Sequence, residues 1–547
     1  MDLGMPWIQR QEQAIIKILN RYNKFLKILI YERNEKMIKE KKFMFFIVVG
    51  IILITGAANI GLANEKMLPD NAADEQILYS PLRGETGAYI DRMKTIYDCV
   101  MDALIVTEPL LALNKDLEII STGVEEWEIS DDHLSWKFNL RKELKWSDGK
   151  PVTAYDYVFA LHRAVQQGYD FSWYWKNIVG IRNWGKIEKG DLPVTELGIK
   201  ALDEYTLVIT TETPRPYLLE TLINLYPVPQ HVVEQYGDEY ATRAETMVGS
   251  GPFRMIEWVR GSHITCDRNP YYGGVLVPYL DKIVFKYGTY NPETGFPAYL
   301  NDEIYRSNLN SGQLAYAKKN IPDQLYSWPM FRIYYITFDT NKPPFDNIKV
   351  RQAFNHALNR EELCSTVLKD LAIPEYSLLM TGFPGHNAVE AKKISGHDEA
   401  LAKKLLAEAG YPGGRGFPKL DLWLRQVDHF AAWQIPAAAY MQAQFKEILG
   451  IDITPRLIES KTYTEALNQN KHNLFLATYQ FDYLDPSNFI NLFITGGRHA
   501  WSNARYDTLA REASSIQDWE KRIKNYRQAE KILVREAPAI FAFQPVF

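Results

Sequence analysis

Few residue patterns in this 547-residue chain could carry out catalysis. Gly249-Ser250-Gly251-Pro252 places a serine between glycines, but it lacks the G-x-S-x-G spacing of a nucleophile elbow. Gly413-Gly414-Arg415-Gly416 is rich in glycine, yet no strand and helix flank it in the order that a dinucleotide site requires. Because neither pattern has the setting of a catalytic or cofactor site, we expect turns at both places and no cofactor.

The acidic, histidine and cysteine residues give no stronger sign of a reaction. Asp131-Asp132 and Glu125-Glu126 lie beside strand and turn signals, where a solvated surface is a simpler interpretation than acid–base chemistry. No two of the ten histidines stand four residues apart on one helical face, although a metal site built from distant residues stays open. The three cysteines, which are Cys99, Cys266 and Cys364, include no CxxC pair, so neither a disulfide scaffold nor a zinc site is indicated. The sequence therefore favours binding over catalysis, and we do not expect an enzyme.

Length and charge narrow the class of protein further. A chain of 547 residues exceeds the size at which one hydrophobic core keeps growing, so we expect at least two lobes. With 46% apolar and 24% charged residues, the composition is that of an ordinary folded protein. The net charge of -5 provides no basic surface for a phosphate backbone, which argues against nucleic acid as a partner.

The N-terminus carries a pattern typical of export. Lysines near Met37 precede an apolar run from Phe43 to about Ala58, and Gly61-Leu62-Ala63 supplies small residues for a signal peptidase. We expect a cleaved signal peptide over 37–63. The alternative is an uncleaved membrane anchor, but the apolar run is shorter than the roughly 20 apolar residues that span a bilayer. Residues 1–36 are basic and helix-like, and we interpret them as lying upstream of the true start, with a membrane-surface helix as the alternative. Because no cysteine follows the run, a lipoprotein is not expected, which favours a soluble protein in a periplasm.

Hydrophobic periodicity predicts a mixed α and β fold. Alternating apolar residues predict strands over 135–141, 205–209 and 474–481. Thr153 and Asp156 form a capping-box pattern, which predicts that a helix begins there. Helical spacing also predicts one helix from Val350 through Leu363 and another over 400–409, the second stopped by Gly410.

Four stretches, in this order along the chain, resemble the oligopeptide and dipeptide binding proteins of ABC importers, a family of extracytoplasmic solute-binding proteins. They are the segment from Glu126-Trp127-Glu128-Ile129-Ser130-Asp131 to Asp156, the segment from Gly249-Ser250-Gly251-Pro252-Phe253 to Tyr279-Leu280-Asp281, the Asn341–Arg360 turn and helix with its VRQAxxxAxxR pattern, and the segment from Asp482-Tyr483-Leu484-Asp485-Pro486 to Ala537-Pro538. Together they span almost the whole chain after the leader.

The resemblance implies an α/β fold of the two-lobed periplasmic-binding-protein type (class II, type C clamp) with an extra inserted lobe. Lobe I would combine 64–107 with 232–333, the extra lobe II would be 108–231, and lobe III would be 334–547. In that family the chain returns to lobe I after the Ala-Pro motif, and since the sequence stops at Phe547 we expect this return to be missing.

The resemblance also implies a function and a set of site residues. The protein would capture short peptides by their α-ammonium and backbone and deliver them, as a monomer, to an ABC permease of the inner membrane. Asp482 would pair with the α-ammonium, the strand carrying Tyr479, Gln480 and Phe481 would pair with the peptide backbone, and Trp173 and Tyr174 would help to form the wall of a side-chain pocket in a loop.

Other interpretations stay open at this point. Tyr479 and the aromatic residues around Trp173 could equally be core packing, and Asp482 could cap the loop before Pro486, a role that suits Asp485 better. Relatives with the same fold carry nickel complexes, haem, opines or oligosaccharides, and a periplasmic peptidase or chaperone is an alternative of a different class. The peptide length and the partner of the ligand carboxylate do not follow from the sequence.

Overall fold

The computed structural model describes residues 74–82, 90–95, 103–426, 431–469 and 474–547, and the side chains at 431 and 432 are excepted. The leader expected over 1–63 lies outside these residues, as does Cys99. All of the described residues lie in one compact unit of the chain. Across the described ranges, no helix combines the length and apolar character needed to cross a membrane.

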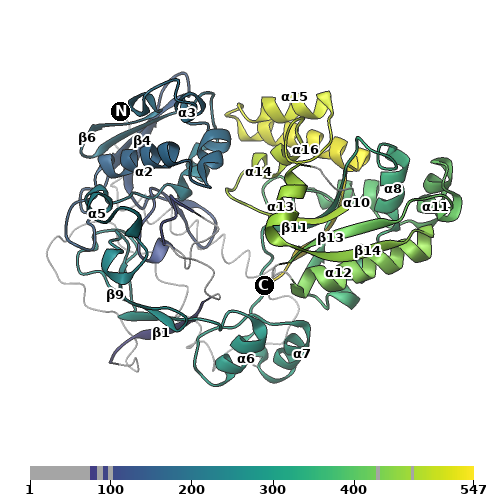
Figure 1. Cartoon of the computed structure of the whole chain (residues 1–547), viewed down its shortest axis with the longest axis horizontal. Coiled ribbons are helices and arrows are strands. Elements are labelled where there is room, and N and C mark those ends of the chain that lie inside the picture. Colours follow the sequence, from purple (N-terminus) through teal and green to yellow (C-terminus); the bar gives the residue numbers. More distant parts are fainter. Residues whose placement is uncertain (1–73, 83–89, 96–102, 427–430, 470–473) are drawn as a thin grey trace, which may run out of the picture. The chain divides into compact units, whose positions relative to one another are not determined.

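Two four-stranded sheets occupy the first part of the described chain (Figure 1). In spatial order, the first consists of β1 (Ile77–Pro81), β10 (Lys282–Lys286), β9 (His263–Arg268) and β8 (Phe253–Val259), and the second of β4 (Val124–Ile129), β5 (Ser135–Leu140), β7 (Thr206–Thr210) and β6 (Ile199–Asp203). Neighbouring strands are antiparallel except β1 and β10, which are parallel. One hydrophobic cluster contains side chains from both sheets, such as Phe138 and Phe285, so the two sheets share a core.

Shorter elements connect and cover these two sheets. They are the strand pair β2 (Ala112–Leu113) and β3 (Ile119–Ile120) and the helices α2 (Ala154–Gln167), α3 (Trp184–Glu188), α4 (Leu218–Thr221), α5 (Gln230–Tyr236), α6 (Pro292–Leu300) and α7 (Ser311–Asn320). Single helical turns of 3-10 type lie at Ala103–Ile105, Val194–Glu196, Leu222–Asn224, Gly237–Glu239, Ala244–Thr246 and Pro322–Gln324, and a π-helical turn lies at Tyr174–Val179.

A six-stranded mixed sheet forms the centre of the second part. Its spatial order is β12 (Ala372–Pro374), β16 (Ala539–Pro545), β11 (Arg332–Phe338), β15 (Leu474–Gln480), β13 (Leu420–Gln426) and β14 (Ile453–Glu459). β13 is parallel to both of its neighbours, whereas β11 is antiparallel to β15 and β16. Every residue of β11 and β16 is buried, as expected for strands that are covered on both faces.

Helices cover both faces of this sheet, which Figure 1 shows for the green and yellow part of the chain. Successive side chains of a strand point to opposite faces, so Tyr334 and Ile336 join one hydrophobic cluster while Ile333 and Tyr335 join the other. The first cluster is completed by α8 (Ile348–Ala357), α11 (Glu399–Glu408) and α12 (Ala431–Gln444), and the second by α10 (Ala388–Ser395), α13 (Ser460–Asn468), α14 (Ser487–Ile490), α15 (Ala504–Ala513) and α16 (Trp519–Glu536). The remaining short pieces are α9 (Arg360–Glu362), the π-helical turns Leu363–Val367 and Phe445–Leu449, and the 3-10 turns Pro412–Gly414 and Asn491–Phe493.

Most of the local predictions are confirmed. Trp136, Phe138 and Leu140 of β5 are buried while the residues between them are partly exposed. The backbone N–H of Thr153 donates a hydrogen bond of 2.8 Å to the Asp156 carboxylate, and α2 begins at the next residue. Strands β7 and β15 and helix α11 lie where alternation and helical spacing predicted them.

The segment at Gly249, predicted to be a turn, is a loop that bends at Gly251 and Pro252, and the glycine at its start has a steric cause. A Cβ atom on Gly249 would lie 1.8 Å from the carbonyl oxygen of Val106, closer than any side chain could approach. Only glycine therefore allows this loop to contact the backbone of the neighbouring segment.

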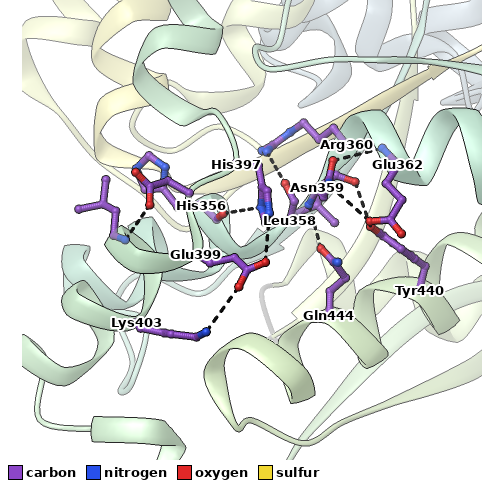
Figure 2. Close-up of polar contacts among 12 residues, drawn as sticks. His356, Leu358, Asn359, Arg360, Glu362, His397, Glu399, Lys403, Tyr440 and Gln444 are labelled. Carbon is purple, nitrogen blue, oxygen red and sulfur yellow. Dashed lines mark hydrogen bonds and ion pairs between the residues drawn. The ribbon is translucent and has the colours of Figure 1, made fainter.

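The prediction of one continuous helix from Val350 through Leu363 is wrong. Helix α8 ends at Ala357, Leu358 takes an extended conformation, and Asn359 begins a new helical turn by accepting a hydrogen bond from the N–H of Glu362. Figure 2 shows this break, with the Gln444 side chain accepting the Asn359 N–H at 2.9 Å. Apolar spacing is preserved across the break, so periodicity alone could not reveal it. Asn359 followed three residues later by Glu362 is a capping pattern, and this pattern could have indicated the start of a new helix.

The last residue of the VRQAxxxAxxR pattern, Arg360, follows this break directly. Its guanidinium is fully buried and donates to the carbonyl oxygens of Phe541 at 2.6 Å and of Asn355 and Ser395 at 3.2 Å. Among the described residues no carboxylate forms an ion pair with Arg360, and burial lowers the pKa of the guanidinium to about 10. The arginine thus joins α8, the α10 end and β16 through neutral acceptors.

Replacing Arg360 by methionine should lower the free energy of unfolding by about 3 kcal/mol or more, because buried carbonyl groups would lose their donors. Urea denaturation followed by circular dichroism measures this change. Arg505→Met, at an exposed position of α15, is the control and should unfold like the wild type. Equal stability of the Arg360 variant would mean that the carbonyl groups find other donors.

Candidate functional site

Asp482 lies two residues beyond the end of β15 and is held by two neighbours. Its Oδ2 accepts hydrogen bonds from the Tyr479 hydroxyl at 2.5 Å and from Nδ2 of Asn488 at 3.1 Å, and its own N–H donates to Oδ1 of Asn488 at 2.9 Å. No described residue donates a hydrogen bond to Oδ1 of Asp482. One carboxylate oxygen is therefore fixed in position while the other is left to accept a further donor.

The electrostatic setting of Asp482 is a balance of burial and hydrogen bonding. Burial raises the pKa of this carboxyl, while the hydrogen bonds from Tyr479 and Asn488 and the positive charge of Arg498 oppose the rise. The net direction is upward, so the ionised form is less favourable here than in water. A cation brought to the free oxygen would gain from this incomplete compensation.

Asp485, three residues later, has a structural role. Its Oδ1 accepts the Ser487 N–H at 2.9 Å, and its Oδ2 forms a 3.0 Å ion pair with Arg522 of α16; both side chains are buried. The expectation that Asp485 caps the loop is confirmed. Since Asp482 bonds to side chains and Asp485 to the loop backbone, the two aspartates differ in function.

The end of β15 has one edge that no described strand covers. β11 pairs with β15 along its whole length, whereas β13 pairs only with Phe475 and Leu476. Residues 477–480 therefore have no strand partner on the β13 side within the described ranges. Backbone groups on such an edge can pair with an added extended chain.

The three predicted residues of this strand end lie in different surroundings. Tyr479 is partly buried, and its ring packs edge-on against Phe489 at 5.5 Å. Gln480 is exposed and accepts a hydrogen bond from Arg332, while the N–H of Phe481 donates to the carbonyl of Phe331 at 2.9 Å. Of the three, Tyr479 is the one whose side chain contacts Asp482.

The aromatic segment around Trp173 is helical, which corrects the expectation of a loop. Trp173 is partly buried and lies edge-on to Phe171 and Tyr174, each at 5.9 Å. Tyr174 is fully buried; its hydroxyl donates to the Thr221 carbonyl at 2.9 Å and accepts from Nδ2 of Asn224 at 3.1 Å. Tyr174 therefore presents no free ring face in this structure, because core packing and polar partners occupy it.

Two residues that the sequence did not single out contact the segment Asp482-Tyr483. Nδ2 of Asn224 donates to the backbone carbonyl of Asp482 at 3.2 Å as well as to Tyr174. The ring of Tyr217 stacks on Tyr483 with centroids 5.3 Å apart. These contacts join residues more than 250 positions apart, and no spacing in the sequence could have indicated them.

The described residues contain no group of three histidine, cysteine or acidic side chains arranged to hold a metal ion. The arrangement that remains is a partly buried carboxylate beside a strand edge that no described strand covers, together with aromatic side chains. Chemically, such an arrangement can bind a cationic group that is attached to an extended polar backbone.

An α/β architecture with a partly buried carboxylate at a strand end is typical of a ligand-binding protein. The sequence profile of the bacterial extracellular solute-binding proteins, family 5 middle, matches residues 119–501. The chain belongs to the bacterial extracellular solute-binding proteins of family 5.

Named relatives give this family assignment its detail. The chain is 31% identical, over 80% of its length and 82% of the relative's, to the probable deoxycholate-binding periplasmic protein YgiS of Escherichia coli. It is 28% identical, over 80% of its length and 82% of the relative's, to the periplasmic oligopeptide-binding protein OppA of Haemophilus influenzae. The solved structure of the Escherichia coli murein tripeptide binding protein MppA matches with a TM-score of 0.72 and 27% identity, covering 87% of this chain and 93% of that one. The expected family and two-lobed fold are thereby confirmed.

The two aspartates should respond differently when each is replaced by asparagine. Asp485→Asn should lower the free energy of unfolding by about 3 kcal/mol, because Arg522 would keep a buried charge without its partner. Asp482→Asn should leave the stability unchanged or raise it, since burial already disfavours the ionised form of that carboxyl. Urea denaturation at neutral pH compares the two, and a large loss with Asp482→Asn would assign that residue a structural role.

Proposed function

We propose that this protein is an exported, soluble solute-binding protein that captures short peptides and delivers them to an ABC permease of the inner membrane. It acts as a monomer in the periplasm and does not transform its ligand. The signal peptide over 37–63 and the division into lobes 64–107 with 232–333, 108–231 and 334–547 form part of this proposal. The observation that carries it is the Asp482 oxygen to which no described residue donates a hydrogen bond, beside the β15 edge that no described strand covers.

The chemistry of a peptide explains why this arrangement suits it. Every peptide with a free N-terminus offers an α-ammonium and repeating N–H and C=O groups, while its side chains vary. A carrier that accepts many sequences should therefore hold the constant groups: Asp482 the ammonium, and the backbone of Tyr479 and Gln480 the peptide backbone. Trp173 would contact the variable side chains, and Tyr174 would contribute by positioning Asn224.

The relatives support a peptide as the ligand, and one of them favours a second candidate. OppA and MppA are named for oligopeptides and a murein tripeptide, whereas YgiS, at 31% identity, is named for deoxycholate. Deoxycholate carries a carboxylate and no ammonium, so the charge of Asp482 would repel it. The free carboxylate oxygen therefore favours the peptide, and a binding experiment should include both ligands.

A screen by thermal unfolding distinguishes these ligands. Protein refolded from denaturant, so that bound ligand is removed, is mixed with tri- to pentapeptides, with their N-acetylated forms and with deoxycholate. A ligand at about 100 times its dissociation constant stabilises the folded protein by roughly 2.7 kcal/mol. Stabilisation by deoxycholate alone would contradict peptide capture.

Asp482→Asn should weaken the binding of free-amine peptides by at least about tenfold, because a charge-assisted hydrogen bond of roughly 1.5–3 kcal/mol is lost. Calorimetry measures the affinity, and N-acetylated peptides should bind both proteins equally weakly. Asp132→Asn is the matched control, since Asp132 is exposed on the β4–β5 turn and should bind as the wild type does. Unchanged affinity in the Asp482 variant would remove this residue from the site.

Peptide affinity should also fall as the pH is lowered from about 7, because a protonated Asp482 cannot pair with an ammonium. Since burial raises the pKa of Asp482, the loss should begin at a higher pH than for an aspartate in water. Dissociation constants measured over this range, with circular dichroism to verify folding, give the profile. The dependence should disappear in Asp482→Asn; an identical slope in both proteins would point to another titrating group.

A further inference from the structure

Arg498 is a charged residue near the candidate site that neither the family resemblance nor the sequence patterns singled out. It follows the turn at Gly496-Gly497 and precedes the buried His499. Its side chain is partly buried, and the guanidinium carbon lies 5.7 Å from the centre of the Tyr479 ring. Arg498 is thus placed beside the residue that orients Asp482.

The guanidinium of Arg498 has no hydrogen-bond acceptor among the described residues. Its Nε is buried without a partner, and no described carboxylate lies within ion-pair distance of it. Other guanidinium groups in the same part of the chain do have acceptors, since Arg351 donates to the carbonyl of Glu536 and Arg522 pairs with Asp485. A partly buried guanidinium without acceptors favours an anion, because five N–H donors are otherwise poorly satisfied.

Arg498 and Asp482 contact opposite parts of one side chain. Asp482 accepts the hydroxyl hydrogen of Tyr479, and Arg498 lies over its ring. The positive charge of Arg498 also acts on the Asp482 carboxyl, which places the two groups within electrostatic range of each other. Tyr479 therefore separates a negative and a positive group instead of letting them form a direct ion pair.

We propose that Arg498 binds a ligand carboxylate that lies within one residue of the α-ammonium held by Asp482. Two kinds of peptide carry this chemistry: a dipeptide, through its C-terminal carboxylate, and a longer peptide whose first residue is aspartate or glutamate. A longer peptide with a neutral first residue has its carboxylate farther away and gains nothing from Arg498. This inference rests on the proposed capture of peptides and names the ligands that the same site prefers.

A simpler role for Arg498 would be to keep Asp482 ionised. In that case Arg498→Gln would weaken all free-amine peptides by the same factor, whatever carboxylates they carry. Affinities for pairs of ligands that differ only by one carboxylate distinguish the two roles of Arg498.

The test measures the affinity of wild type and Arg498→Gln by calorimetry for two ligand pairs. The first pair is Ala-Ala and its C-terminal amide, and the second is Asp-Ala-Ala-Ala amide and Asn-Ala-Ala-Ala amide. In the wild type, the carboxylate-bearing member of each pair should bind at least about tenfold more tightly, and in Arg498→Gln this preference should fall to about one. Arg498→Lys should keep part of the preference, because it retains the charge and loses the forked donors.

Arg505→Gln is the matched control, since it removes one positive charge from an exposed position seven residues along the chain. It should keep the full preference, which excludes an effect of net charge. If only one of the two pairs shows a carboxylate preference that Arg498→Gln abolishes, the result supports the proposal and identifies which of the two carboxylates Arg498 binds.

Two results would overturn the inference, and they are distinguishable. If peptides bind but both pairs show no carboxylate preference in the wild type, or the same preference in Arg498→Gln, Arg498 does not bind the carboxylate and peptide capture stands. If none of the peptides binds the well-folded wild type, the proposed function fails and the inference fails with it.

Discussion

The structure depends on the cost of partly burying a carboxylate at the end of a strand. Asp482 is stabilised by neighbouring hydrogen bonds only in part, so its position must be fixed by the rigidity of what surrounds it. That rigidity comes from β15, whose side chains alternate between two hydrophobic clusters, and from the buried Asp485–Arg522 pair that secures the following loop. A strand buried on both faces cannot slip in register without exposing an entire apolar face.

Buried arginines also fix the positions of the helices in this part of the chain. Arg351 donates to the carbonyls of Phe345 and Glu536, and Arg360 to those of Phe541, Asn355 and Ser395. Three of these acceptors, the carbonyls of Asn355, Ser395 and Glu536, lie in the last turn of a helix, where regular structure leaves carbonyl groups unpaired. The arginines of the VRQAxxxAxxR pattern thus stabilise the fold that positions the site and do not contact it.

Local periodicity and family resemblance were sufficient to predict several strands, one helix start and the family from the sequence. Alternation located β5, β7 and β15, the capping pair at Thr153 and Asp156 located the start of α2, and the ordered motifs identified the family. Helical spacing failed at Leu358 and Asn359, because a short extended break leaves the apolar pattern intact. Asn224, Tyr217 and Arg498 could not have been found, since their proximity to residues 479–483 is created by tertiary structure alone.

The edge of β15 beyond Leu476, which no described strand covers, has a consequence for the handling of the protein in solution. An unpaired row of backbone donors and acceptors attracts any extended chain, and that includes a second molecule of the same protein. A ligand that pairs with this edge would shield it, so ligand-free preparations should be the more prone to self-association and to slow aggregation on storage. Occupancy of the site would then determine colloidal behaviour as well as transport.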